Sequence, residues 1–190
     1  MTSIIILAAG SSSRLGQPKQ NVIYRGQTLL QRAIETALAS ICAPVIVVLG
    51  ANATSIIPTV RELPVNLIQN PDWAEGMSSS IRSGIIELKR IAPSVTAVIL
   101  MLCDQPFVDT HHLNFLIMAK SKSGVAACSY DDTIGVPALF DVIYFDELIA
   151  LKGHEGAKKL LSKYADVVTS IPLPQGSIDI DTIEDFGKLK

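Results

Sequence analysis

A loop of small residues with two cations lies near the start of the chain, at residues 8–19 (AAGSSSRLGQPK). Small side chains let backbone N–H groups come close to a ligand, and successive N–H groups can form an anion-binding nest. Arg14 offers a planar fork for phosphate oxygens, and Lys19 offers a mobile point charge. The loop therefore predicts phosphate binding; an ordinary connecting loop with surface Arg and Lys is the alternative.

The glycine pattern distinguishes this loop from two widespread nucleotide-binding loops. The spacing of Gly10 and Gly16 does not match the Walker pattern, and no Gly-Lys-Ser/Thr follows. The GxGxxG pattern of dinucleotide-binding folds does not fit either, so the loop gives little support to dinucleotide binding.

Carboxylates that could bind a cation occur in two places. Asp104 follows the most apolar run of the chain, residues 97–102, so it is expected to project into the crevice at the end of a buried strand. A turn residue before a proline is the alternative for this position. Asp179 and Asp181 are two positions apart and share a face if the segment is extended. Asp181 or Thr182 could instead cap a last helix.

Short apolar runs alternate with helix-like stretches along the chain. A β-α-β-α order predicts an α/β fold of the single-domain, Rossmann-like kind, with a mainly parallel sheet and helices on both faces. Unbroken apolar strands indicate that both faces of the sheet are covered. Without repeats or linkers, one domain over residues 1–190 is expected. Strands are predicted at residues 4–7, 45–49, 65–68, 97–102, 125–129, 138–140 and 167–171, and helices at 28–40, 53–62, 78–90, 109–120 and 155–164.

Two of these helices carry signals that need a structure to interpret. Pro58 interrupts the helix predicted at residues 53–62, which makes that helix the weakest of the set. The helix at residues 78–90 opens with several serines. Serine hydroxyls at a helix N-terminus can cap the helix or donate to a ligand, and different serines can do each.

The composition limits the classes of function. With 190 residues, 48% hydrophobic and 18% charged, the chain can bury a substantial core. Sixteen Lys and Arg against 18 Asp and Glu provide no basic field for nucleic acid. The three Cys form no CxxC or Cys/His cluster, so reduced, mostly buried thiols in a cytoplasmic protein are expected. The apolar runs are too short to span a membrane, and the first lacks the basic region of a signal peptide.

Residues 7–19 resemble the signature of the nucleotidyltransferases that include the molybdenum cofactor cytidylyl- and guanylyltransferases. The shared pattern, Leu-Ala-Ala-Gly-x-Ser-x-Arg-x-Gly-x-x-Lys, fixes eight or more positions. The resemblance implies a nucleotide-diphospho-sugar transferase-like fold. It also implies that residues 8–10 lie against the nucleobase and ribose, and that Arg14 and Lys19 hold the triphosphate. The guanylyltransferase branch usually has Gly where this chain has Ala9, so the resemblance favours CTP over GTP.

Later segments resemble the same family in the expected order. Asp104 lies in an Asp-x-Pro that resembles the family's metal-binding motif, and residues 179–186 (DIDTIEDF) resemble its Asp-x-Asp-Thr-Pro-Glu-Asp-Leu ending. These matches imply Mg²⁺ on Asp104 and Asp181, with Asp179 as the reserve. The implied catalytic residues are Arg14, Lys19 and Asp104, and the implied nucleotide-binding residues are Leu7, Ala8, Ala9, Gly10, Ser12, Arg14, Lys19, Gly76, Ser80 and Asp104.

Two segments resemble the acceptor side of the family. Residues 135–140 match a Gly-x-Pro segment, and residues 153–158 partly match Gly-Asp-x-Gly-Ala-Arg. His154 stands where the family has Asp, and Lys158 where it has Arg; a Lys cannot reproduce a bidentate Arg contact. A plain surface residue is the alternative for His154. The implied acceptor-binding residues are Gly135, Pro137, His154 and Lys158.

The implied reaction is attack by an acceptor phosphate oxygen on the α-phosphorus of a nucleoside triphosphate, with release of pyrophosphate. The favoured partners are CTP and molybdopterin, with a molybdoenzyme as a recipient. A transferase acting on a sugar phosphate or another small phosphate is the first alternative. The second is a non-catalytic accessory protein that binds nucleotide or cofactor for a molybdoenzyme. The combination of Arg14, Lys19, Asp104 and Asp181 favours catalysis.

Overall fold

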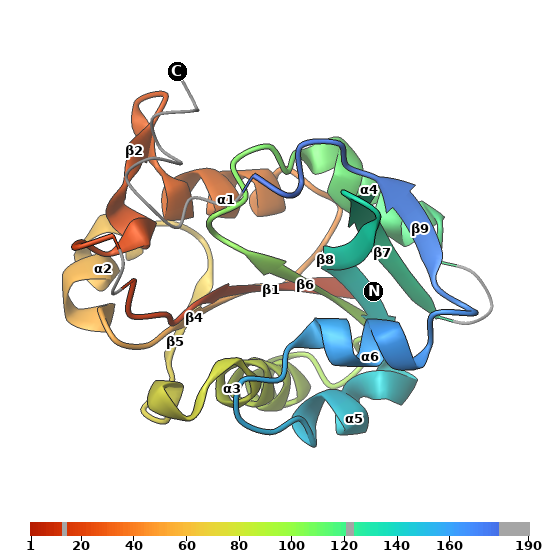
Figure 1. Ribbon diagram of the computed structural model, residues 1–190. Helices are drawn as coiled ribbons and strands as arrows, with labels where there is room; N and C mark the ends of the chain where they lie inside the picture. Colours follow the sequence, from red (N-terminus) through yellow and green to blue (C-terminus); the bar gives the residue numbers. More distant parts are fainter. Residues whose placement is uncertain (13–14, 121–123, 179–190) are drawn as a thin grey trace.

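The structure is a computed structural model that describes residues 1–12, 15–120 and 124–178. Its centre is a seven-stranded sheet with the order β5-β4-β1-β6-β8-β7-β9 (Figure 1). Strands β5, β4, β1 and β6 are parallel, β8 runs antiparallel to both β6 and β7, and β9 is parallel to β7. The strands are β1 (Thr2–Ala8), β4 (Val45–Leu49), β5 (Asn66–Gln69), β6 (Ala97–Leu102), β7 (Val125–Tyr130), β8 (Thr133–Asp141) and β9 (Thr169–Pro172).

Helices cover both faces of this sheet (Figure 1), as the sequence predicts. On one face lie α1 (Leu29–Leu38), α2 (Ala53–Val60) and α4 (Thr110–Met118). On the other lie α3 (Met77–Ile91), α5 (Phe145–Ile149) and α6 (Ala157–Lys163). The α/β fold with a mostly parallel sheet is therefore confirmed.

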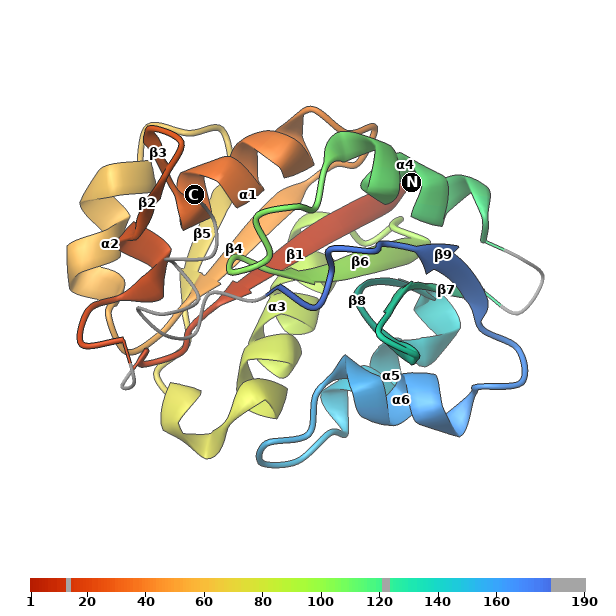
Figure 2. The same cartoon turned by 45° about the horizontal axis from the view of Figure 1, so that its top comes forward.

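Strand β1 shows why an unbroken apolar run is needed. Ile4 and Ile6 point into the core on the α1 face, whereas Ile5 and Leu7 point into the core on the α3 face. Successive side chains of a strand face opposite sides, so a strand covered on both faces must be apolar at every position. β1 pairs with β4 on one side and β6 on the other, and Figure 2 shows these strands side by side in the middle of the molecule.

Most predicted elements are confirmed, with boundaries shifted by a few residues. Helix α4 begins with a capping box: the side chain of Asp109 accepts from the backbone N–H of His112 at 3.0 Å, and His112 Nδ1 accepts from the backbone N–H of Asp109 at 3.4 Å. Helix α2 forms despite Pro58 in its interior and buries Ala53, Ile56 and Val60. Tertiary burial thus outweighs the local cost of the proline.

Several short elements are not apparent from the sequence. They are the β2–β3 hairpin (Ile23–Tyr24 and Gln27–Thr28), helix α5, and the 3-10 turns η1 (Lys19–Asn21), η2 (Trp73–Glu75) and η3 (Val142–Tyr144). The antiparallel strand β8 is also longer than the predicted residues 138–140. Within the described ranges, no helix is both long enough and apolar enough to cross a bilayer.

Candidate active site

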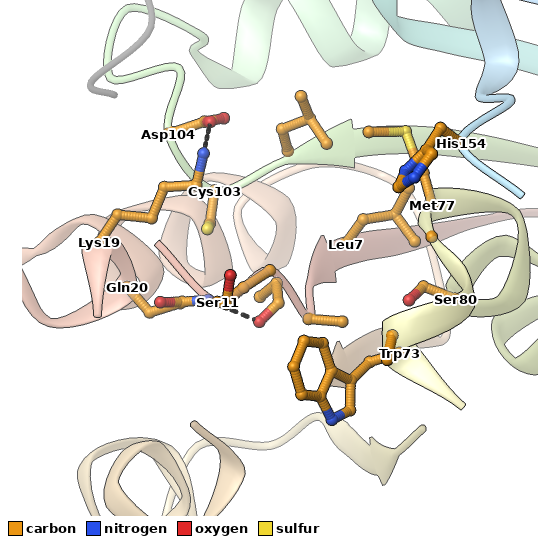
Figure 3. A pocket seen from close by; sticks show the side chains of 16 residues that line it. Leu7, Ser11, Lys19, Gln20, Trp73, Met77, Ser80, Cys103, Asp104 and His154 are labelled. Atoms are coloured by element: carbon orange, nitrogen blue, oxygen red, sulfur yellow. Dashed lines mark hydrogen bonds and ion pairs between the residues drawn. The ribbon is translucent and has the colours of Figure 1, made fainter. Parts of the chain in front are cut away.

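A pocket of about 550 Å³ opens where strands β1 and β6 end (Figure 3). The pairing of Leu7 with Leu102 brings the two strand ends together, so the first loop lies beside the turn that carries Asp104. A pocket of this size suits a nucleotide-sized ligand. Its lining residues are Leu7, Ala8, Ala9, Gly10, Ser11, Lys19, Gln20, Trp73, Ala74, Gly76, Met77, Ser80, Leu102, Cys103, Asp104 and His154.

Lys19 and Asp104, 85 positions apart in the chain, form an ion pair at one side of the pocket (Figure 3). Asp104 is only 4% exposed, and its Oδ2 pairs with Lys19 Nζ. Its Oδ1 is also buried, and no atom of the described residues bonds to it. A buried carboxylate oxygen without a partner is costly, so this oxygen is suited to bind a cation or another polar ligand group.

The first loop is held in shape by Gln20, which is fully buried. Its Nε2 donates to the carbonyl oxygens of Ala8 at 2.7 Å and Gly10 at 3.2 Å. Ser12 adopts a positive φ of 55°, and its Oγ accepts from the backbone N–H of Lys19 at 3.0 Å. These bonds tie the two ends of the loop to η1, so the loop is shaped before any ligand arrives.

The serines at the start of α3 have separate roles. Ser78 Oγ donates to the Gly153 carbonyl at 2.8 Å, and Ser79 Oγ donates to the Asp72 carbonyl at 2.8 Å. Asn70, which is 1% exposed, donates from Nδ2 to Ser79 Oγ at 2.8 Å and to Ser80 Oγ at 3.0 Å. Ser78 and Ser79 therefore serve the protein's own structure, while Ser80 lines the pocket. The helix itself has no side-chain cap at Gly76.

His154 is brought to the pocket by a close backbone contact. The backbone N–H of Ser78 donates to the carbonyl of Gly153 at 3.2 Å, which fixes the loop before α6 against the start of α3. Gly76 has a φ of 114°, and a Cβ there would overlap the Gly153 carbonyl. His154 lines the same pocket as the first loop and is exposed.

The other predicted acceptor residues lie elsewhere in the fold. Gly135 and Pro137 belong to β8, and Lys158 is an exposed residue of α6; none is among the pocket-lining residues. A Cβ at Gly135 would overlap the Tyr130 hydroxyl, which donates to the Val136 carbonyl at 3.2 Å. Packing against Tyr130 is therefore one reason for the glycine at this position.

Three predicted residues, Arg14, Asp179 and Asp181, lie outside the described residues. The described chain nevertheless leads from β9 towards the turn after β6. Gln105 Nε2 donates to the Gly176 carbonyl at 3.0 Å, so residues close to Asp179 in the chain are anchored next to Asp104 in space. Among the residues that the structure describes, no group of three or more His, Cys, Asp or Glu could hold a metal ion.

Sequence reasoning missed seven residues of the pocket wall: Ser11, Gln20, Trp73, Ala74, Met77, Leu102 and Cys103. Trp73 carried a usable signal, since it is the single tryptophan of the chain and directly follows the polar, turn-forming residues Asn70, Pro71 and Asp72. Gln20 carried none, because its role depends on burial. Burial raises the pKa of the Cys103 thiol to about 12, so it is a neutral lining group at physiological pH.

The sheet order, the shaped loop at the end of β1 and the buried Asp104 agree with an α/β nucleotidyltransferase, and a family match shows that the chain is of this class. The chain belongs to the family described as the MobA-like NTP transferase domain, whose family model matches residues 4–167. This membership confirms the resemblance that the first loop indicates.

Two relatives cover nearly the whole chain. The nicotine blue oxidoreductase of Paenarthrobacter nicotinovorans is 29% identical, covering 97% of this chain and 94% of that protein. The purine catabolism protein PucB of Bacillus subtilis is 29% identical, covering 98% of this chain and 94% of that protein. The molybdenum cofactor cytidylyltransferase of Escherichia coli is 33% identical over a shorter stretch, 43% of this chain and 42% of that protein.

Solved structures share the fold over almost the full chain. Rv0371c from Mycobacterium tuberculosis has a TM-score of 0.84 at 29% identity, covering 99% of this chain and 96% of that one. The same protein in complex with manganese has a TM-score of 0.82 at 28% identity, covering 99% of this chain and 97% of that one.

Proposed function

We propose that this protein transfers CMP from CTP to a phosphorylated acceptor, with molybdopterin as the favoured acceptor, and releases pyrophosphate. The observation that carries the proposal is a single pocket that combines the small-residue loop, the Lys19–Asp104 pair and Ser80. Membership of the MobA-like family supports nucleotide transfer. The partial match to a molybdenum cofactor cytidylyltransferase supports the choice of donor and acceptor.

The chemistry requires positioning and charge neutralisation more than a proton-transfer group. A phosphomonoester has a second pKa of about 6, so the acceptor is largely ionised at neutral pH and needs no general base. Its oxygen attacks the α-phosphorus, and the bond to the departing pyrophosphate breaks. Backbone N–H groups around Gly10 and the ammonium of Lys19 would offset charge on the phosphates; Arg14 is expected to join them.

The donor set at Asp104 fits a divalent cation. Its Oδ1, which has no hydrogen-bond partner among the described residues, is a hard oxygen ligand, and Mg²⁺ prefers one or two carboxylates together with phosphate oxygens. The manganese complex of the mycobacterial relative supports the binding of a divalent cation by this kind of protein. Asp104 would hold the ion with Asp181, or with Asp179 in its place, and the ion would neutralise phosphate charge when bound.

Manganese binding tests this assignment without relying on turnover. Asp104→Asn should weaken Mn²⁺ binding by about ten-fold or more, measured by electron paramagnetic resonance, because a carboxylate ligand is lost. Asp146→Asn is the matched control, since Asp146 is an exposed residue of α5 that pairs with Lys89 of α3. Equal Mn²⁺ affinity in both variants would remove Asp104 from the metal site.

The preference for CTP rests on Ala9, whose surroundings are crowded. A Cβ at Gly50 would lie 2.5 Å from the Ala9 carbonyl oxygen and 2.8 Å from the Ala9 Cβ. One extra carbon in a snug site is worth roughly 1–3 kcal/mol, which is enough to disfavour a larger purine. Calorimetry with Mg²⁺ should show tighter binding of CTP than of GTP. In Ala9→Gly, the difference between the dissociation constants of CTP and GTP should be smaller. Tighter binding of GTP to the natural protein would contradict the assignment of the base.

A screen of the four nucleoside triphosphates against molybdopterin and common sugar phosphates tests the reaction itself. Release of pyrophosphate that needs both CTP and molybdopterin is the expected result. Release of pyrophosphate with a sugar phosphate, but not with molybdopterin, as the acceptor would identify a sugar-phosphate nucleotidyltransferase instead. Tight nucleotide binding with no release would favour an accessory protein that hands over its ligand.

A further inference from the structure

Trp73 is a large aromatic side chain in the wall of the candidate active-site pocket. It is the only tryptophan in the sequence, and it is 37% exposed. The residues that follow it in the pocket wall, Ala74, Gly76 and Met77, carry no ring. A tryptophan left open in a pocket keeps much apolar surface in contact with water, and covering that surface with a ligand is favourable.

The backbone that carries Trp73 is held in place before any ligand binds. Asn70 Oδ1 accepts from the Asp72 N–H at 3.0 Å, and the Asp72 carbonyl accepts from Ser79 Oγ at 2.8 Å. On the other side, the Trp73 carbonyl accepts from the Gly76 N–H at 3.1 Å. The indole is therefore presented by a braced turn between β5 and α3, so little order has to be gained when a ligand binds.

The absence of a side chain at Gly50 brings Trp73 against the first loop. A Cβ at Gly50 would lie 2.7 Å from the Trp73 Cβ and 2.5 Å from the Ala9 carbonyl oxygen. Gly50 follows β4, the neighbour of β1 in the sheet, so it marks the place where the loop and η2 meet. The indole consequently borders the position on which the choice of base depends.

The pocket has a charged side and an aromatic side. Figure 3 shows the Lys19–Asp104 pair and the Trp73 indole at opposite sides of the pocket. A nucleotide has the same polarity, with a charged phosphate chain at one end and a flat aromatic base at the other. If the phosphates lie at Lys19 and the loop, the base is directed to the side of the pocket that Trp73 forms.

We infer that the indole of Trp73 is the surface on which the nucleobase stacks, an inference that rests on the proposed nucleotide-transfer function. Every base has an aromatic face, so stacking supplies affinity without selecting a particular base. The roles then divide: Trp73 holds the ring, Ala9 limits its size, and Lys19 holds the phosphates.

The single tryptophan makes direct detection straightforward. In the full chain with Mg²⁺, CTP should quench the intrinsic fluorescence of Trp73 in a saturable way. Inorganic tripolyphosphate, which has charge but no ring, should compete with CTP and cause little quenching by itself. Saturating CTP binding measured by calorimetry with no change in tryptophan fluorescence would overturn the stacking role and leave nucleotide transfer intact.

Substitution gives the second measurement. Trp73→Leu should weaken CTP binding by roughly ten-fold or more and leave tripolyphosphate binding within about two-fold, since base stacking is lost and the phosphate contacts remain. Trp73→Phe should recover most of the affinity. The control is Phe115→Leu, which removes an exposed aromatic ring from α4 and should bind CTP normally.

The outcomes separate the inference from the function on which it rests. Equal loss of CTP and tripolyphosphate affinity in Trp73→Leu would mean general damage to the pocket and would overturn stacking. Absence of binding by all four nucleoside triphosphates to the natural protein would overturn nucleotide transfer and the stacking role together. Quenching by the acceptor but not by CTP would also overturn the inference, because the ring on Trp73 would belong to the acceptor.

Discussion

At the scale of single residues, the buried carboxylate of Asp104 needs a positive charge, and Lys19 supplies it from a segment far away in the chain. The pair also explains why Lys19 is well placed to meet a phosphate. Its ammonium lies at the pocket wall, and its side chain is 21% exposed. A ligand phosphate can therefore approach the cation without the cation leaving its partner.

Lys19→Ala should slow turnover by about 100-fold or more, because a cation at the developing charge is lost. It should also lower the free energy of unfolding by about 1–3 kcal/mol, since Asp104 is left buried without its partner. Initial-rate assays and urea denaturation measure the two effects. The control is Lys89→Ala, which breaks the exposed pair with Asp146 and should change neither quantity appreciably. Normal turnover in Lys19→Ala would show that the loop is only structural.

At the scale of elements, the site depends on how two loops are fixed to their neighbours. The first loop is tied to η1 by the amide of Gln20, and the loop before α6 is tied to α3 by the Gly153 carbonyl. Neither tie is made by a side chain that is expected to perform chemistry. Each can therefore be broken separately from the catalytic groups.

Gln20→Glu keeps the shape of the side chain but removes the N–H donors that Ala8 and Gly10 accept from. Two carbonyls would then face carboxylate oxygens in a buried place, and the free energy of unfolding should fall by about 1–3 kcal/mol. The Michaelis constant for CTP should rise because the loop is no longer preshaped. The matched control is Gln27→Glu, which removes an exposed amide that bonds to Glu35 and should affect stability by less than about 1 kcal/mol. An unchanged Michaelis constant in Gln20→Glu would show that this amide does not shape the loop.

Gly76→Ala tests the contact between α3 and the loop that carries His154. The new Cβ would overlap the Gly153 carbonyl, and the residue would keep a φ of 114° that alanine rarely adopts. Gly26→Ala is the control for a positive φ without overlap, since Gly26 has a φ of 84° and open space around it, whereas Gly76 combines its φ of 114° with a ψ of −173° and a close neighbour. The cost of Gly26→Ala should be near the 1–2 kcal/mol expected for conformation alone, and Gly76→Ala should cost at least about 1 kcal/mol more. Equal midpoints of urea denaturation for the two variants would contradict the close approach.

At the scale of the whole molecule, the two apolar cores on either side of the sheet disfavour the ionised form of any thiol buried in them. Cys42, Cys103 and Cys128 are free and buried, as the cysteine count predicts. Burial raises the pKa of the Cys128 thiol to about 12, against an ordinary value of 9.0. The folded protein therefore keeps this thiol protonated at a pH where the unfolded chain loses the proton.

Stability should consequently fall as the pH rises above 9. From pH 8 to pH 10 the unfolded state releases the Cys128 proton and the folded state does not, which costs about 1.4 kcal/mol for this thiol. Cys128→Ala should have a lower free energy of unfolding than the natural protein at pH 8. Between pH 8 and pH 10, that free energy should fall by about 1.4 kcal/mol less in the variant than in the natural protein. Urea denaturation in the presence of a reductant gives both slopes. Parallel slopes would mean that Cys128 ionises equally in the folded and unfolded states.

The sequence by itself determined the elements whose signals are local. The apolar run before residue 8 had to be a strand covered on both faces, and the small residues after it had to form a loop at its end. The same reasoning placed Asp104 after the most apolar strand, and family membership agrees with the pattern carried by residues 7–19. Composition and spacing suffice here because each feature involves residues close together in the chain.

Only the tertiary structure decided which distant residues share the pocket. Strand register brings Asp104 beside Lys19. The bond from Ser78 to the Gly153 carbonyl joins residues 75 positions apart and places His154 at the start of α3. Trp73 became a candidate ligand contact because Gly50 lets it approach Ala9. Such proximities arise from packing between elements, and packing is set by the sum of many burial contacts that no single stretch of sequence contains.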